Sequence, residues 1–466
     1  MCPRPAPYCR RILPGWRALI FFALLVLGCV AGSELEAQTT LYWDNNGASP
    51  GSGGPSPSAT WATGNSASAR QWSTDPNGTS ASVGWNPNTI AVFSAGADAT
   101  GAFAANVNGT QSVTGIYVEE GTPTFTSGTI KFNPASAIFD VASGSSAIVN
   151  TELSGAGTQL NKNGGGTLVL SGPTAIAGTF AVNEGTLEVS GNNLLTSQTN
   201  AVTVASGSTF SLSGSTGVAN TSTIGALSGR GAVNIAADTV LQLNNASTDT
   251  FDGTIGGAGV FSKTGAGTLS FSAVGNTSAF NFSGTVQMAA ANQTDTLEFH
   301  GGTAANALSI GTLRLNGGTL LLNASFINVG TLNITGDTIL DFGTGGASIL
   351  NANNIYIAAG KTLTIKNWTS EVDFLFANSS FRQTDESGKL AIFNATGSAP
   401  ENQVVFDGNL SGDTPTTWVN DNFQGYTNFE IRPIPEPSMY GVGLIAGSIG
   451  LLVWRKRSRH RRSASP

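Results

Sequence analysis

Large apolar residues recur at every second position in short runs along the chain, and most of these runs follow a Gly-Thr pair. Residues 155–191 contain the phrase twice, as GTLVL at 166–170 and GTLEV at 185–189. In the first phrase Leu168 and Leu170 alternate with Thr167 and Val169. A period of two is typical of a β-strand with one buried face. Glycine before each run favours a turn, so each phrase predicts a turn, a short strand and a second turn.

The phrase recurs in the second half of the chain, at residues 267–271, 311–315, 318–320 and 330–334, and without its glycine at 361–365. A longer frame, GAG…K…GTL, occurs at 155–168 and again at 257–269. Self-similarity of this kind indicates a repeat architecture. A strand of four or five residues cannot bury its apolar pair alone, so successive coils must stack. We therefore predict an all-β fold, an elongated parallel β-solenoid over residues 145–370 with roughly 20 residues per coil.

The alternation also predicts which side chains point into the solenoid, because every second residue of a strand lies on the same face. The predicted inward residues are Leu168, Leu170, Leu187, Val189, Leu269, Phe271, Leu313, Leu315, Leu332, Ile334, Leu363 and Ile365. The second half of the long frame matches more loosely, with TLEF at 296–299 corresponding to TLEV at 186–189.

The frame G-x-G-x-L-x-K-x-G-x-GTL-x-LSG, followed by GTF-x-V-x-x-GTL-x-V, resembles the autotransporter-associated β-strand repeat of secreted bacterial passenger domains. Residues 155–191 match it well and residues 257–299 match it partly. The resemblance implies a right-handed parallel β-helix and implies no particular activity. Autotransporters continue into a membrane barrel of alternating strands, whereas this chain ends in a different pattern.

The N-terminus has the pattern of a secretory signal. Four arginines precede an apolar run at residues 18–27, and a stretch of smaller residues ends at Ala37. A basic region, an apolar core of about ten residues and a small residue at the break are typical of a signal peptide. We expect residues 1–37 to be removed by signal peptidase after Ala37. A membrane anchor is an alternative, although the run is short for a span, and Cys29 offers a weaker lipoprotein-type site.

Residues 434–466 carry the most specific motif of the chain. Pro435, Glu436 and Pro437 precede an uncharged apolar run at 439–454, which is followed at once by Arg455, Lys456 and Arg457. The run suits a short transmembrane helix, and the basic cluster favours the cytoplasmic side. Motif, span and basic cluster together resemble the PEP-CTERM sorting signal, also described as the C-terminal domain of ice-binding proteins. The resemblance implies processing near the motif by an exosortase-type membrane transpeptidase.

Charge is distributed unevenly along the 466 residues. Ten of the 21 basic and three of the 28 acidic residues lie in the two terminal segments, which leaves 11 basic against 25 acidic residues, a net charge of about −14, in the body of the chain. An acidic body lacks the clustered lysine and arginine that nucleic acids require. All three cysteines, Cys2, Cys9 and Cys29, precede residue 30, so we expect neither disulfides nor thiolate chemistry in the mature protein.

The N-terminal region of the body, residues 38–144, differs from the repeats in composition, because it has tryptophans between Gly/Ser/Pro-rich segments. Trp43, Trp61, Trp72 and Trp85 have two interpretations. They could form a platform for stacking sugars, or they could close the open end of the solenoid, which would otherwise present bare strand edges. We favour the cap. At the other end, apolar runs without the Gly-Thr-Leu phrase predict a closing β region at residues 371–433.

Candidate catalytic groups are sparse. Glu119 and Glu120 are adjacent, so in a strand they point to opposite faces and cannot form an acid/base pair. Glu371 and Asp373 could share a face, and we interpret them as solvated surface residues. The oxygen-rich turn at Asp407 lacks the distal glutamate of an EF-hand, and we interpret His300 as an exposed turn residue. We predict no enzymatic activity, no cofactor and no metal.

Three function classes remain open. The first is an exported surface or extracellular-matrix protein with a structural or adhesive role, for which exopolysaccharide is a candidate partner. The second is a glycan-binding exoprotein, which needs an exposed aromatic row. The third is an ice-binding solenoid, which needs a regular ladder of outward threonine. For all three we expect export through the inner membrane, transient membrane contact through the C-terminal helix, and a mature form on the cell surface, in the outer membrane or outside the cell.

Overall fold

The computed structural model describes residues 39–377, with gaps at 134–135, 156, 158, 192–194, 196–199, 215–219, 273–279, 290–293, 304–306, 359 and 370–371, together with 404–407, 416–420 and 429–433. The chain divides into two compact units, Met1–Thr39 and Thr40–Pro466. The described residues belong to the second unit, apart from Thr39. All of its named elements are β-strands.

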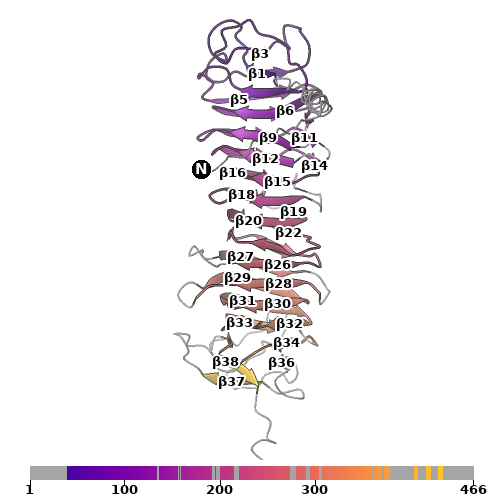
Figure 1. Cartoon of the computed structure of the whole chain (residues 1–466), viewed down its shortest axis with the longest axis vertical. Helices are drawn as coiled ribbons and strands as arrows, with labels where there is room; N and C mark the ends of the chain where they lie inside the picture. Colours follow the sequence, from indigo (N-terminus) through magenta and orange to yellow (C-terminus); the bar gives the residue numbers. More distant parts are fainter. Residues whose placement is uncertain are drawn as a thin grey trace, which may run out of the picture. The chain divides into compact units, whose positions relative to one another are not determined.

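Each turn of the second unit contributes short strands that pair in parallel with those of the next turn (Figure 1). The strands β10 (Ser146–Val149), β11 (Glu152–Gly155) and β12 (Gln159–Asn163) form one turn, and β13 (Thr167–Leu170), β14 (Thr174–Ile176) and β15 (Phe180–Val182) form the next. Ser146 pairs with Thr167, Leu153 with Thr174, and Leu160 with Phe180. Because the paired residues lie 20 or 21 positions apart in all three strands, each turn stacks on the next, and the predicted parallel β-solenoid is confirmed.

The strands form three sheets, of 19, 9 and 10 strands. The 19-stranded sheet contains β11, β12, β14 and β15 together with β1 (Thr40–Trp43), β3 (Trp72–Ser73), β4 (Thr89–Phe93), β6 (Thr110–Val118), β8 (Thr129–Phe132), β9 (Ser136–Val141), β17 (Ala201–Val204), β20 (Ala226–Gly229), β23 (Asp249–Phe251), β26 (Thr268–Ser272), β28 (Thr296–His300), β30 (Thr319–Asn323), β32 (Thr338–Asp341), β34 (Leu363–Lys366) and β36 (Val404–Asp407). The 9-stranded sheet contains β10 and β13 together with β2 (Ala59–Trp61), β5 (Ala102–Val107), β7 (Thr122–Thr126), β16 (Thr186–Ser190), β18 (Thr209–Ser213), β21 (Ala232–Ile235) and β24 (Thr254–Gly257). The 10-stranded sheet contains β19 (Asn220–Ile224), β22 (Thr239–Leu243), β25 (Val260–Lys263), β27 (Asn281–Met288), β29 (Leu308–Asn316), β31 (Phe326–Gly336), β33 (Ile349–Ile357), β35 (Phe374–Ala377), β37 (Thr416–Asn420) and β38 (Phe429–Pro433).

The core of the solenoid is a set of inward-facing apolar rows that run from turn to turn. Every side chain predicted to point inward is buried, with an exposed fraction of at most 3%, reached by Phe271. The two copies of the Gly-Thr-Leu phrase in residues 155–191 lie on neighbouring turns and pair with each other. Leu168 pairs with Leu187, and Leu170 pairs with Val189. Like residues therefore stack on like, and each turn buries the apolar pair of the turn before it.

The Gly-Thr-Leu phrase is not tied to one sheet. It begins β13 in the 9-stranded sheet, β26 in the 19-stranded sheet and the second half of β29 in the 10-stranded sheet. The glycine has a local reason, because a Cβ on Gly166 would collide with the carbonyl oxygen of Ala142, and a Cβ on Gly185 would collide with that of Gly166. At these two phrases one turn's backbone therefore lies too close to the turn before it for a side chain.

The parallel stack ends in reversed strands on both sides. At the N-terminal end β1 pairs antiparallel with β3 through Trp43 and Trp72. At the C-terminal end β38 pairs antiparallel with β35 and with β37. Between these ends the 19-stranded sheet pairs in parallel, from β4 to β6, β9 and β12 near its N-terminal end and from β34 to β36 near its C-terminal end. A reversed strand covers edge groups that a further parallel strand could otherwise use.

Replacing Leu187 by alanine tests the inward rows. Leu187 is 1% exposed and lies between Leu168 and Phe210 of the neighbouring turns, so we expect the cavity to cost about 2–5 kcal/mol of unfolding free energy. The control is Thr186→Ala on the same strand, which faces outward and is expected to change stability by about 0.5 kcal/mol or less. Urea unfolding followed by circular dichroism measures both. Equal losses for the two variants would contradict the inward assignment.

Candidate functional site

The residues predicted from the terminal motifs lie outside the described residues. They are Ala37 at the signal cleavage site, Pro435, Glu436 and Pro437 of the sorting motif, and Arg455, Lys456 and Arg457 beside the apolar run. In the part of the chain that the structure describes, no helix is long and apolar enough to cross a membrane.

The four tryptophans of the N-terminal region form a buried cluster. Trp43, Trp61, Trp72 and Trp85 are each at most 2% exposed. The ring centroids of Trp72 lie 5.1 Å from Trp43, 5.2 Å from Trp61 and 4.6 Å from Trp85, and Phe93 packs against the same group. The edge-to-face arrangements are those that aromatic pairs favour in a core. Their burial favours the cap interpretation, and these rings cannot form the exposed platform that the sugar-stacking interpretation required.

The outward faces of the turns carry single-file rows of small polar residues. In the 9-stranded sheet the row passes through Ser146, Thr167, Thr186 and Thr209, and it is interrupted at Ala232. The 10-stranded sheet has a shorter row of threonines, formed by Thr285, Thr312 and Thr331. The 19-stranded sheet has another, formed by Thr268, Thr296 and Thr319. Most of these threonines are the second residue of a Gly-Thr pair, and Thr209 and Thr296 are the exceptions. The row in the 9-stranded sheet is one residue wide, because the next outward position holds Val169, Glu188 and Ser211.

A lysine lies inside the solenoid wall at the corner after β12. Lys162 is fully buried, and its Nζ donates to the carbonyl oxygens of Asn163 at 2.8 Å, Gly164 at 2.7 Å and Glu184 at 3.1 Å. Burial lowers the pKa of Lys162 to about 8, although the carboxylates of Asp140 and Glu184 favour its charged form. The ammonium therefore ties the corner of its own turn to the turn that follows.

A second buried lysine, Lys263, ends β25 and lies at a corner that follows a different sheet. Lys263 is 1% exposed and its Nζ donates to the carbonyl oxygen of Gly265. Burial lowers its pKa, and the carboxylates of Asp295 and Asp249 act in the opposite direction. Asp295 is also buried, which raises its pKa, while Lys263 lowers it. In both corners a lysine inside the wall interacts with acidic residues from other turns.

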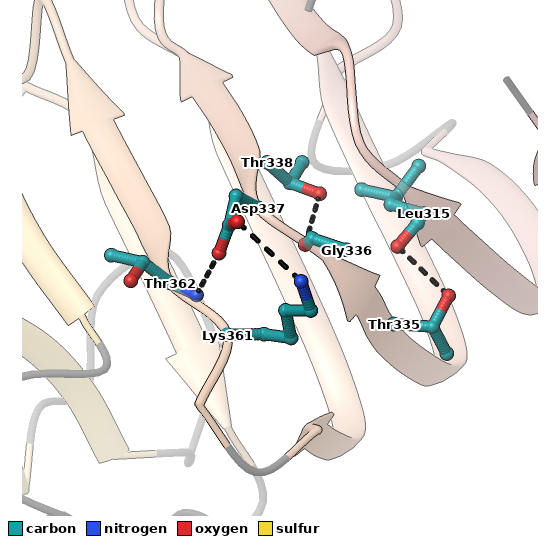
Figure 2. Close-up of polar contacts among 7 residues, drawn as sticks. All are labelled: Leu315, Thr335, Gly336, Asp337, Thr338, Lys361 and Thr362. Carbon is teal, nitrogen blue, oxygen red and sulfur yellow. Dashed lines mark hydrogen bonds and ion pairs between the residues drawn. The ribbon is translucent and has the colours of Figure 1, made fainter. Parts of the chain in front are cut away.

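Exposed corners use weaker contacts of the same kind, as Figure 2 shows for the turn between β31 and β32. The Asp337 carboxylate accepts a hydrogen bond from the backbone N–H of Thr362 at 3.0 Å and lies 3.6 Å from the Nζ of Lys361. Both charged side chains are well exposed, so the ion pair contributes about 0–1 kcal/mol. The backbone contact is the one that links successive turns.

Two of the acidic residues considered from the sequence hold neighbouring backbone or side-chain groups in the structure. The interpretation of Asp373 as a solvated residue is wrong: it is 3% exposed and accepts from the N–H groups of Ser348 at 3.0 Å and Thr369 at 2.9 Å. Glu371 lies outside the described residues. Glu120 accepts from the Ser94 hydroxyl at 2.7 Å and holds a loop. Among the described residues no group of three or more His, Cys, Asp or Glu side chains converges on a metal position.

Comparison with known families gives one match. Residues 160–189 and 261–291 match the passenger-associated transport repeat. No curated protein and no solved structure matches the chain. Lys162 and Lys263 lie at the same position of the two matched segments, two residues from the start of each. Sequence reasoning noted both lysines in the repeated frame but gave them no role. Their common position in that frame was the available signal.

The pKa of Lys162 gives a pH-dependent prediction. In the unfolded chain this lysine titrates near its ordinary pKa of 10.5, and in the folded protein near about 8. Between these values the unfolded chain holds more protons, so raising the pH increases the stability contributed by this residue. We expect Lys162→Met, which leaves three carbonyl oxygens without their donor, to cost about 1–3 kcal/mol at pH 7. The loss relative to the native sequence should grow at pH 10.

The matched control is Lys361→Met, which removes an exposed lysine of the same charge. Its cost should stay below about 1 kcal/mol. Urea unfolding of the native sequence and both variants at pH 7 and pH 10 provides the comparison. An unchanged difference between the native protein and Lys162→Met at the two pH values would contradict the lowered pKa of this buried lysine.

Proposed function

We propose that this protein is an exported bacterial surface or extracellular-matrix protein with a structural or adhesive role and no catalytic activity. The single observation that carries the proposal is the unbroken parallel stack, built from strands that match the passenger-associated transport repeat at residues 160–189 and 261–291. Repeats of this kind make stability a sum of contacts between neighbouring turns. Such a stack suits a protein that must persist outside the cell without disulfides. The resemblance further supports right-handed winding.

The terminal segments supply the export and sorting part of the proposal. Residues 1–37 act as a signal peptide cleaved after Ala37, and residues 434–466 act as a sorting signal with a transmembrane helix. Proline on both sides of Glu436 favours an extended segment, because each ring removes a donor and restricts the residue before it. An extended segment beside the membrane is accessible to a processing enzyme of the exosortase type. The apolar run with its basic end favours a cytoplasmic C-terminus before processing.

The glycan-binding alternative has lost its main support, since the tryptophans that it needed are buried. The ice-binding alternative is also disfavoured, because the outward threonine rows are one residue wide and Glu188 lies beside the longest row. The absence of enzymatic activity remains part of the proposal, supported by the structural roles of Glu120 and Asp373. An exported structural or adhesive protein accounts for both the repeat and the terminal segments. We therefore prefer this function to the glycan-binding and ice-binding alternatives.

Replacing Pro435, Glu436 and Pro437 together by alanine in the native host tests the sorting step. We expect the triple variant to accumulate in the inner membrane with its C-terminus intact, because the processing enzyme loses the extended motif that it binds. The native sequence should appear outside the cell, shortened between residues 435 and 438. Cell fractionation and mass spectrometry of the C-terminal peptide measure both outcomes.

A double variant, Pro400→Ala with Pro415→Ala, controls for the loss of proline in general and should be sorted like the native sequence. If the triple variant reaches the surface with its tail removed at the same place, the sorting motif is not used. A plain tail anchor trimmed by other proteases would then replace it.

A further inference from the structure

One corner of the stack buries carboxyl groups beside a lysine. Lys263 ends β25 in the 10-stranded sheet, and Asp295 directly precedes β28 in the 19-stranded sheet, one turn further along the chain. Both residues are 1% exposed. Neither Oδ1 nor Oδ2 of Asp295 has a hydrogen-bond partner among the described residues. A buried carboxyl group without a partner is costly, so its position in the core needs an explanation.

The backbone register places Lys263 and Asp295 in the same corner of the core. Lys263 pairs with Met288 of the next turn, and Met288 is also 1% exposed. Cε of Met288 and Cβ of Asp295 lie 3.3 Å and 3.4 Å from the position that a Cβ on Gly318 would take. Asp295 therefore lies beside the side chain whose strand partner is Lys263. Its charge is the larger of the two that favour the charged form of Lys263.

Asp249 is the second carboxyl group of this corner. It pairs with Leu269, which pairs with Leu297, and because both leucines are buried, Asp249 lies on the inward face of β23. Its Oδ2 is buried without a hydrogen-bond partner. Burial raises the pKa of Asp249 and of Asp295 and lowers the pKa of Lys263. The corner therefore favours an uncharged amine beside uncharged carboxyl groups.

We propose that Lys263 and Asp295 condense to an internal amide bond, which links two successive turns covalently. Nζ of the uncharged lysine attacks Cγ of the protonated Asp295 carboxyl group, so that an N–C bond forms and the C–O bond to the hydroxyl breaks. Asp249 gives its proton to the departing hydroxyl and takes one from the nitrogen. The products are one amide and one water, and no other reagent is consumed.

The reaction requires a movement of the lysine side chain alone. Nζ of Lys263 donates to the carbonyl oxygen of Gly265 and must leave it to reach Asp295. A lysine side chain can do this by changing rotamers, while its backbone stays in β25. Phe261 and Leu297, two positions away on the same inward faces, are fully buried. An amide in this corner is therefore shielded from water and from hydrolysis.

Lys162 is a comparison within the same molecule. Its Nζ donates to three carbonyl oxygens. Its acidic neighbours are Asp140 and Glu184, and neither belongs to the described residues that have a buried oxygen without a hydrogen-bond partner. We therefore expect no amide bond at Lys162, and trypsin should cut after it completely.

The test is mass spectrometry of the full chain after denaturation and digestion with trypsin. Trypsin cuts after lysine and arginine, and Lys263 is the only such residue between Arg230 and Arg314. Because an amide on Lys263 blocks cleavage, residues 231–314 should appear as one peptide, lighter than its sequence by the mass of one water. Chymotrypsin, which cuts after aromatic residues, should release the fragments that carry Lys263 and Asp295 joined to each other.

Variants separate the amide from other losses of water, such as cyclisation of an aspartate. Lys263→Arg should restore both the full mass and cleavage after residue 263. Asp295→Asn should give the same linked peptide by loss of ammonia in place of water, whereas Asp295→Ala should give none. Asp249→Ala should slow accumulation of the link after synthesis by about a hundredfold.

The competing explanation is a buried Asp295 that keeps its proton and never reacts. It predicts complete cleavage after Lys263 and an unchanged mass in the native chain. That result would overturn the proposal, as would a loss of water that persists in Lys263→Arg. The first of these measurements needs no variant, so it does not depend on whether any variant folds.

Discussion

The close approach of each turn's backbone to the turn before it is the constraint on which this structure depends. Parallel pairing places Ser146 on Thr167 and Thr167 on Thr186, so the same position of every turn meets its counterpart. Where the two backbones are nearest, a side chain would collide with the carbonyl oxygen below, and glycine occupies positions such as 166 and 185. The leucine rows and the outward threonine rows both follow from that one contact, because alternation distributes the next residues to the two faces.

The same contact determines where polar groups are needed inside the wall. At a corner the chain leaves the ladder, so carbonyl oxygens point to the interior without a backbone partner. Lys162 supplies three hydrogen bonds at such a corner, and Ser348 and Asp373 together satisfy another, near the C-terminal end. These buried polar residues therefore satisfy backbone groups at the corners, and the acidic neighbours of Lys162 lie on the turns before and after it.

Much of the fold could be predicted from the sequence because its signals are local. Alternation beside Gly-Thr assigned the inward face of Leu168, Leu313 and Leu363 correctly, since a period of two needs no knowledge of the rest of the chain. The sheet to which each phrase belongs was not predictable, because it depends on the accumulated length of the preceding loops. The inward position of Lys162 and the burial of Asp373 were missed for another reason. Charged residues are usually exposed, and only the three-dimensional corner shows what they bind.

The reversed strands at the two ends bear on how copies of this protein could associate. A parallel ladder with free edges is a template on which another chain can continue, which leads to filaments. In the described part of the chain, β1 is covered by β3 and β35 by β38, both running in the opposite direction. At these two ends the template is thus occupied by the protein's own chain. Because a further parallel strand cannot add there, contact between copies is directed to the sides of the stack, where the small polar residues of the outward rows lie.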